Sequence, residues 1–197
     1  MHMLIELHRL AVLASIDVVS RVQPPDLRRP TPCSEWTLAD LLAHMTVQHN
    51  GFAAAARGNG DDPEVWRVRP LGPDPVAEYS AAADRVLSAF AEDGVLEREF
   101  TLPEFRPVSR FPGARAIGFH LIDYVVHGWD VARSIALPYE LDPHLDETAL
   151  KIALAVPNGD NRLAPDAAFR PALPDTDPAT PLDRILTALG RSPTWPD

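Results

Sequence analysis

Residues 113–136 have the sequence GARAIGFHLIDYVVHGWDVARSIA and form the most apolar long segment of the chain. Apolar side chains recur in it at spacings of three and four residues, which is typical of an α-helix. The polar side chains His120, Asp123 and His127 interrupt this apolar sequence. A helix that is apolar over most of its circumference must be surrounded by other elements, so the segment predicts the central helix of a bundle.

Three further segments have the same helical spacing and end at residues that stop helices. The clearest start is at Thr37, whose hydroxyl can accept from the backbone N–H of Asp40 while the Asp40 carboxylate reaches back, as in a capping box. Together with residues 113–136, these segments predict an all-α protein built on a four-helix bundle. They span residues 4–22, 37–58 and 75–94.

Shorter elements are predicted in the rest of the chain. Residues 96–102 and 105–111 carry β-branched and aromatic side chains around Pro103, a pattern that allows a short hairpin or an irregular loop. Two shorter helices are also predicted, over residues 142–156 and 180–190. Each begins with a capping residue that is followed by a proline.

The chain shows no internal repeat and no low-complexity linker. We therefore expect residues 1–140 to form the bundle and residues 141–197 to form a C-terminal extension of helices and loops that packs on it. The many prolines of residues 157–179 indicate loop structure in that extension.

The composition excludes several classes of protein. The 197 residues carry 18 Lys+Arg against 28 Asp+Glu, a formal net charge of -10, which argues against a nucleic-acid partner. No apolar stretch approaches the roughly 20 residues of a membrane span, and no secretory signal opens the chain. The single cysteine, Cys33, cannot form an internal disulfide, so we expect a cytoplasmic protein. Its oligomeric state is open, with a homodimer as one possibility.

Candidate metal ligands lie on two of the predicted helices. At about 100° per residue, His120, Asp123 and His127 project along one stripe of their helix. His44 lies among apolar residues of the segment 37–58, so it can face the same interior. Histidine and carboxylate at this spacing, with a histidine from a facing helix, form metal sites inside bundles. Alternatively, His44 is a hydrogen-bonded core residue and Asp123 is paired with an arginine.

Three blocks of the sequence resemble a known family. Residues 30–44 (PTPCSEWTLADLLAH) and 123–133 (DYVVHGWDVAR) resemble the maleylpyruvate isomerase-like branch of DinB-type metal-binding proteins, and residues 182–195 (LDRILTALGRSPTW) resemble its actinobacterial members. The resemblance implies up-down-down-up connectivity and a Zn²⁺, Ni²⁺ or Fe²⁺ ion held by His44, Asp123 and His127. The family isomerase has Glu in place of Asp123.

The resemblance also implies an activity. A metal-bound thiolate of mycothiol would attack a small electrophile, as in an S-transferase or a maleylpyruvate isomerase, with the thiol and the electrophile as the small-molecule partners. Two alternatives remain. One is a thiol-independent isomerase, cyclase or hydrolase that uses the metal as a Lewis acid. The other is a metal-binding protein that is not an enzyme.

Other residues are weaker candidates. His120 is a candidate acid or base; alternatively, it supports a metal ligand from behind or lies in the core. Gln48 is a candidate for orienting water or substrate. Arg133 could bind the carboxylate of a ligand or could pair with Asp130. Cys33 precedes a helix N-terminus, where a thiolate is stabilised, but we favour a buried structural role for it.

Two further groups are also ambiguous. Trp36 and Trp129 are expected in the core or in a pocket wall. Arg184 and Arg191 could bind a carboxylate, but surface ion pairing is the favoured expectation for them.

Overall fold

The computed structural model describes residues 2–33, 35–105, 109–164, 167–174 and 179–197. In the described part, helices predominate, as the sequence predicts. The elements are α1 (His2–Val19), η1 (Pro24–Arg28), α2 (Leu38–Ala56), η2 (Pro63–Trp66), α3 (Pro75–Phe90), β1 (Glu99–Thr101), β2 (Arg110–Pro112), α4 (Gly113–Ser134), α5 (Pro143–Ala155), η3 (Asp160–Leu163) and α6 (Pro181–Ala188).

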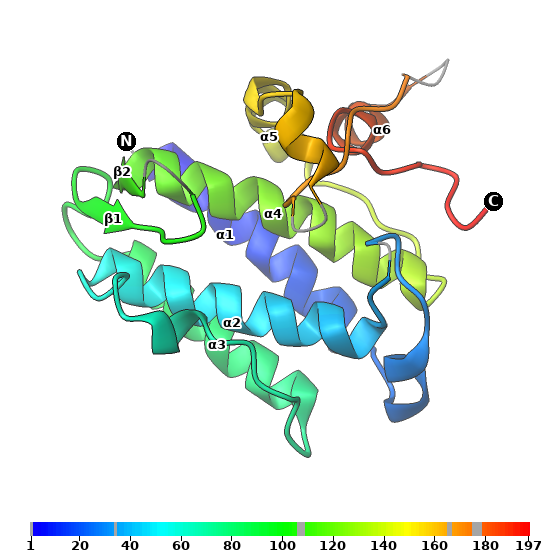
Figure 1. The fold of residues 1–197 in the computed structure, drawn as a ribbon, viewed down its shortest axis with the longest axis horizontal. Helices are drawn as coiled ribbons and strands as arrows, with labels where there is room; N and C mark the ends of the chain where they lie inside the picture. The colour runs from blue at the N-terminus through cyan, green and yellow to red at the C-terminus, as the bar shows by residue number, and fades with distance from the viewer. Residues whose placement is uncertain (1, 34, 106–108, 165–166, 175–178) are drawn as a thin grey trace.

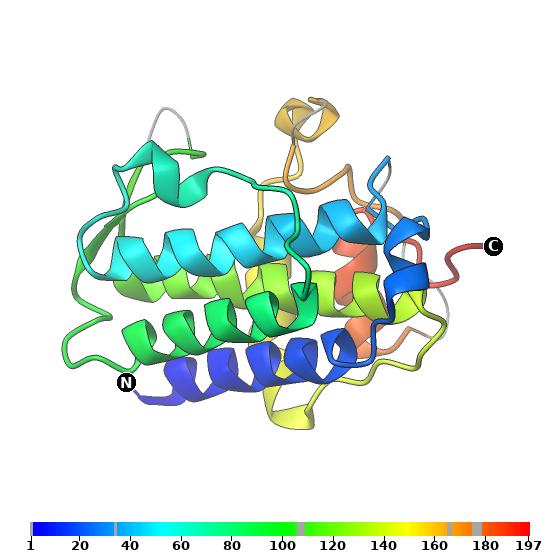
Figure 2. The same ribbon diagram turned by 90° about the horizontal axis from the view of Figure 1, so that it is seen from below.

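The four long helices form a bundle with up-down-down-up connectivity (Figures 1 and 2). Helices α1 and α4 run in one direction, and α2 and α3 run in the other. A long crossover that contains η2 connects α2 to the parallel helix α3. The predicted all-α fold and its connectivity are therefore confirmed.

Capping residues set the helix starts as the sequence predicts. The Thr37 hydroxyl accepts from the Asp40 backbone N–H and the Asp40 carboxylate accepts from the Thr37 backbone N–H, so both halves of the capping box are present. Asp74 caps α3, which begins at the same end of the bundle as α2. The first helix ends at Val19, earlier than predicted, because its last turn tightens into bonds such as Val22 N–H to the Val19 carbonyl.

The predicted hairpin is present as a short antiparallel pair, in which Phe100 lies opposite Phe111. Residues 106–108 of the segment lie outside the described residues. The described end of the turn is attached to the bundle by Phe105, whose ring stacks on Phe119 of α4 with centroids 4.9 Å apart. The hairpin is thereby held against the turn of α4 that precedes Asp123.

The C-terminal segment packs on the bundle through apolar side chains. Leu145 and Ala149 of α5 and Ile185 of α6 are buried in one cluster with Leu121 and Val125 of α4. Arg162, 2% exposed, donates to the backbone carbonyls of residues 156, 157, 170 and 188, which ties the loop to α6. Part of the expected proline-rich loop, residues 165–166 and 175–178, lies outside the described residues. No helix among the described residues is both long and apolar enough to cross a bilayer.

Candidate metal centre

His44 of α2 and Asp123 and His127 of α4 lie together between the two helices. Each offers a ligand atom, and these atoms lie within 4.8 Å of one another. His127 Nε2 lies 3.4 Å from Asp123 Oδ1. Two ligands bound at 2.0–2.2 Å to a tetrahedral ion would be about 3.4 Å apart. The donor set therefore fits a divalent metal ion, and the spacing of Asp123 and His127 matches that of two ligands on one ion.

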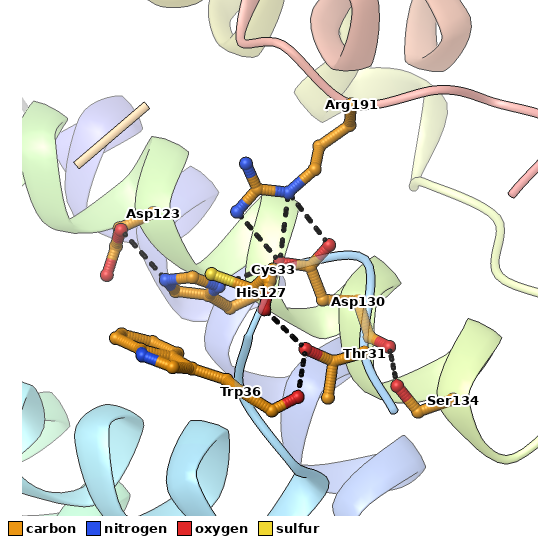
Figure 3. Close-up of polar contacts among 8 residues, drawn as sticks. All are labelled: Thr31, Cys33, Trp36, Asp123, His127, Asp130, Ser134 and Arg191. Atoms are coloured by element: carbon orange, nitrogen blue, oxygen red, sulfur yellow. Dashed lines mark hydrogen bonds and ion pairs between the residues drawn. The ribbon is translucent and has the colours of Figure 1, made fainter. Parts of the chain in front are cut away.

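His127 lies between two carboxylates (Figure 3). Its Nδ1 is 2.9 Å from Asp130 Oδ2, and its Nε2 faces Asp123. A neutral imidazole carries one N–H, so it can donate to only one of the two. At the other contact, a ring nitrogen without a proton faces a carboxylate oxygen, and both are acceptors. A second proton or a metal ion must therefore lie between them. Burial alone would lower the pKa of His127, but Asp123 and then Asp130 outweigh it and raise the pKa above its ordinary value. The site thus favours a cation at this position.

His44 and Trp36 form the other side of the site. Burial, followed by the nearby charge of His127, lowers the pKa of His44 to about 4, so its imidazole is neutral at pH 7 and can bind a metal. The Trp36 ring is 4.8 Å from the His44 ring and 6.5 Å from the His127 ring, between centroids. Trp36 therefore makes an apolar wall beside both imidazoles, one of the two positions expected for it.

A buried ion pair supports His127 from behind. Asp130, fully buried, accepts from Arg191 Nε at 3.1 Å and from Arg191 Nη2 at 3.2 Å, besides its contact with His127. Arg191 follows α6 and is 3% exposed, so the extension supplies this residue to the bundle and the expectation of a surface ion pair for it is wrong. Asp130 does not pair with Arg133, which instead donates to the Trp195 carbonyl.

Metal-bound histidines commonly donate their second N–H to a carboxylate, which fixes the ring and its tautomer. Asp130 gives His127 this support, and Arg191 in turn holds Asp130. Asp130 holds His127 Nδ1 and leaves Nε2 directed at Asp123.

Comparisons with known proteins identify the family. The family model described as "Mycothiol maleylpyruvate isomerase N-terminal domain" matches residues 8–132. The chain belongs to this family. An uncharacterized protein found in two strains of Mycobacterium tuberculosis is 30% identical over 190 residues, which cover 94% of this chain and 96% of that protein.

Solved structures of the mycothiol-dependent maleylpyruvate isomerase have the same fold as this family member. A histidine-to-alanine mutant of that enzyme matches with a TM-score of 0.63 and 14% identity, over 90% of this chain and 77% of that chain. A second structure matches with a TM-score of 0.56 and 16% identity, over 77% of this chain and 67% of that chain.

Cys33 offers a second donor set in this family member, because its Sγ lies within 4.8 Å of ligand atoms of His127 and Asp130. Burial raises the pKa of the Cys33 thiol to about 11. Without a bound ion the thiol is therefore protonated at pH 7, and Asp130 is already engaged by Arg191. Thr31 holds the Cys33 loop by donating to the carbonyls of Cys33 and Trp36. This geometry favours the set of His44, Asp123 and His127.

The remaining candidates lie in different surroundings. Gln48, one turn after His44, donates to the Glu104 carboxylate at 3.3 Å. His120 is 1% exposed in the core, where its ring nitrogens lie 2.8 Å from His8 and 3.3 Å from His49. Its hydrogen bonds go to these two histidines, so the structure favours the core position among its three alternatives.

Two features of the site were not predicted from the sequence. Asp130 lies three residues after His127 on the same stripe, a spacing that could have indicated their contact. Glu104 lies in the hairpin, where no periodic pattern marked it as a site residue. Its contact with Gln48 depends on tertiary packing alone.

Proposed function

We propose that this protein is a divalent-metal enzyme that uses mycothiol as a cosubstrate, of the S-transferase or maleylpyruvate isomerase type. The observation that carries the proposal is the convergence of His44, Asp123 and His127 in a chain of the mycothiol maleylpyruvate isomerase family. Zn²⁺ is the ion we expect, with Ni²⁺ and Fe²⁺ as alternatives, because two imidazoles and one carboxylate suit these metals.

The chain's own residues would hold and orient the reacting groups. His44, Asp123 and His127 would hold the metal ion, which would supply activation of the cosubstrate's thiol as a nucleophile. Asp130 fixes the ring of His127, and Trp36 provides an apolar wall beside the two imidazoles. Because the only cysteine is half-buried and its raised pKa keeps the thiol protonated at pH 7, we infer that the nucleophilic sulfur comes from the cosubstrate.

We also propose the cellular context and the division of the chain. The single cysteine is consistent with a reducing cytoplasm, where a low-molecular-weight thiol is available. Residues 1–140 would form the metal-binding unit. Residues 141–197 would form an extension that contributes Arg191 to it.

Mycothiol-dependent turnover tests this proposal. We expect the metal-loaded protein to consume mycothiol together with an activated alkene or another small electrophile. His127→Ala should reduce the rate at least about 100-fold, because it removes a ligand and a metal-ligand loss of this kind abolishes activation of the nucleophile. His144→Ala, at an exposed position of α5, is the control and should leave the rate unchanged.

The alternatives give different results in the same assay. Turnover that proceeds without any thiol would favour a Lewis-acid enzyme. Absence of turnover, with the same metal content in wild-type protein and His127→Ala, would contradict the proposed site.

A further inference from the structure

Glu104 extends the proposed site beyond its three ligands. It follows β1 at the described end of the hairpin turn, and its carboxylate accepts from Gln48 Nε2 at 3.3 Å. Gln48 is one turn after His44 on α2. The residue next to Glu104, Phe105, stacks on Phe119, which is one turn before Asp123 on α4. Glu104 thus contacts α2 directly, and its neighbour Phe105 holds the same segment against α4.

The charges around Glu104 are negative. Burial of its carboxylate and then the charge of Asp123 raise the pKa of Glu104 to about 7, so the two carboxylates interact. The residue as a whole is exposed, although its carboxylate is directed at Gln48. With a pKa of about 7, Glu104 carries its charge in only about half of the molecules at neutral pH, so we expect a modest effect on ligands there.

Within the described residues, the arginines considered as ligands for a carboxylate near the site are already engaged. Arg191 is buried and donates from Nε and Nη2 to Asp130. Arg133 donates to the Trp195 carbonyl. Trp36 adds an apolar wall beside the imidazoles. With Asp123 engaged by the proposed ion, a ligand bound at that ion on the side of Gln48 would lie near an amide, an aromatic ring and the Glu104 carboxylate.

We propose that Glu104 selects ligands by charge, so that the site takes an electrophile that is uncharged at its reacting end and disfavours carboxylate-bearing molecules. This inference rests on the proposed function and names the substrate class of the same site. It makes Glu104 a specificity-determining residue.

Binding of two matched thiols to the Co²⁺-loaded protein tests the selection without turnover. The probes are 2-mercaptoethanol, which is uncharged, and mercaptoacetate, which carries a carboxylate, and the readout is the sulfur-to-cobalt absorption band. At pH 8, above the raised pKa of Glu104, we expect Glu104→Gln to lower the Kd of mercaptoacetate about 3- to 10-fold, because a like charge beside the ligand is removed. The Kd of 2-mercaptoethanol should change less than about 2-fold, and the difference should shrink at 1 M salt.

Glu97→Gln is the matched control, because it removes the same charge from an exposed position before β1. It should leave both dissociation constants unchanged. Equal changes for both thiols in Glu104→Gln, or no change for either, would overturn the selection.

A second experiment measures the turnover of an uncharged electrophile and of a carboxylate-bearing one. Their intrinsic reactivities cancel when each is compared between variant and wild type. Glu104→Gln should raise kcat/KM for the carboxylate-bearing electrophile alone. An equal loss for both electrophiles would assign Glu104 to proton transfer and overturn the selection. Wild-type protein that binds neither thiol would refute the proposed function itself, before any variant is compared.

Discussion

Arg191→Met is expected to lower the free energy of unfolding by about 3–5 kcal/mol, because it leaves the Asp130 carboxylate buried without its cation. Asp130 is fully buried, and burial alone would raise its pKa. The charge of Arg191 outweighs burial and holds the pKa of Asp130 below its ordinary value. Urea denaturation of the metal-free protein measures this loss. Metal affinity should also fall about 10- to 100-fold, since His127 loses its oriented support.

Two variants separate the buried charge from simple loss of packing. Arg133→Met removes a guanidinium from a half-buried position where it contacts the Trp195 carbonyl, and it should cost only about 1 kcal/mol. Adding Asp130→Asn to Arg191→Met should recover at least about 1 kcal/mol, because the uncompensated charge is removed. A loss as small as that of Arg133→Met would contradict a buried, stabilising ion pair.

The second large effect is loss of stability in mild acid. His8, His49 and His120 lie in the core of the bundle, each with at most 1% exposure. Burial lowers the pKa of His8 to about 3 and holds the pKa values of His49 and His120 well below their ordinary value. The folded protein keeps these imidazoles neutral, whereas the unfolded chain protonates them as the pH falls below about 6.5.

Stability must therefore rise with pH in this range, since the unfolded state binds more protons. Each histidine contributes up to about 1.4 kcal/mol per pH unit, so the three together give up to about 4 kcal/mol per unit below pH 6.5. His44 adds to this slope in the metal-free protein. Glu104 opposes it, because its raised pKa makes the folded state bind a proton between the unfolded value and about 7. His127, with a raised pKa, acts above pH 6.5 and not in this window.

Denaturation of the metal-free protein at a series of pH values between 5 and 7 measures the slope. His8→Gln should reduce the slope by about 1.4 kcal/mol per pH unit, whatever its effect on absolute stability. His144→Gln, at an exposed position, should leave the slope unchanged. Stability that is independent of pH between 5 and 6.5 would contradict neutral histidines in the core.

The helices could be predicted from the sequence because their signals are local. The apolar spacing of residues 113–136 predicted α4, and the pair Thr37 and Asp40 marked the start of α2. The spacing of Asp123 and His127 follows from helix geometry, so their proximity could also be predicted. Caps and periodicity act within a few residues, and single-sequence analysis detects such effects best.

Long-range contacts could not be predicted in the same way. Arg191 reaches Asp130 only because the extension packs on α4, and no local pattern distinguishes it from a surface arginine. His8 and His49 join His120 in the core because three different helices bring them together. Glu104 is placed by the packing of Phe105 on Phe119, in a segment without periodicity.

Metal content tests the central claim most directly. Wild-type protein, purified without added metal or after loading with Zn²⁺ and removal of the excess, should carry about one equivalent, as expected for a site with three protein ligands. His44→Ala should carry less than about one-tenth of an equivalent under the same conditions, because it removes one of the three proposed ligands. Wild-type protein that holds less than about one-tenth of an equivalent, and cannot be loaded with Zn²⁺ or Ni²⁺, would contradict the metal centre and the thiol chemistry proposed on it.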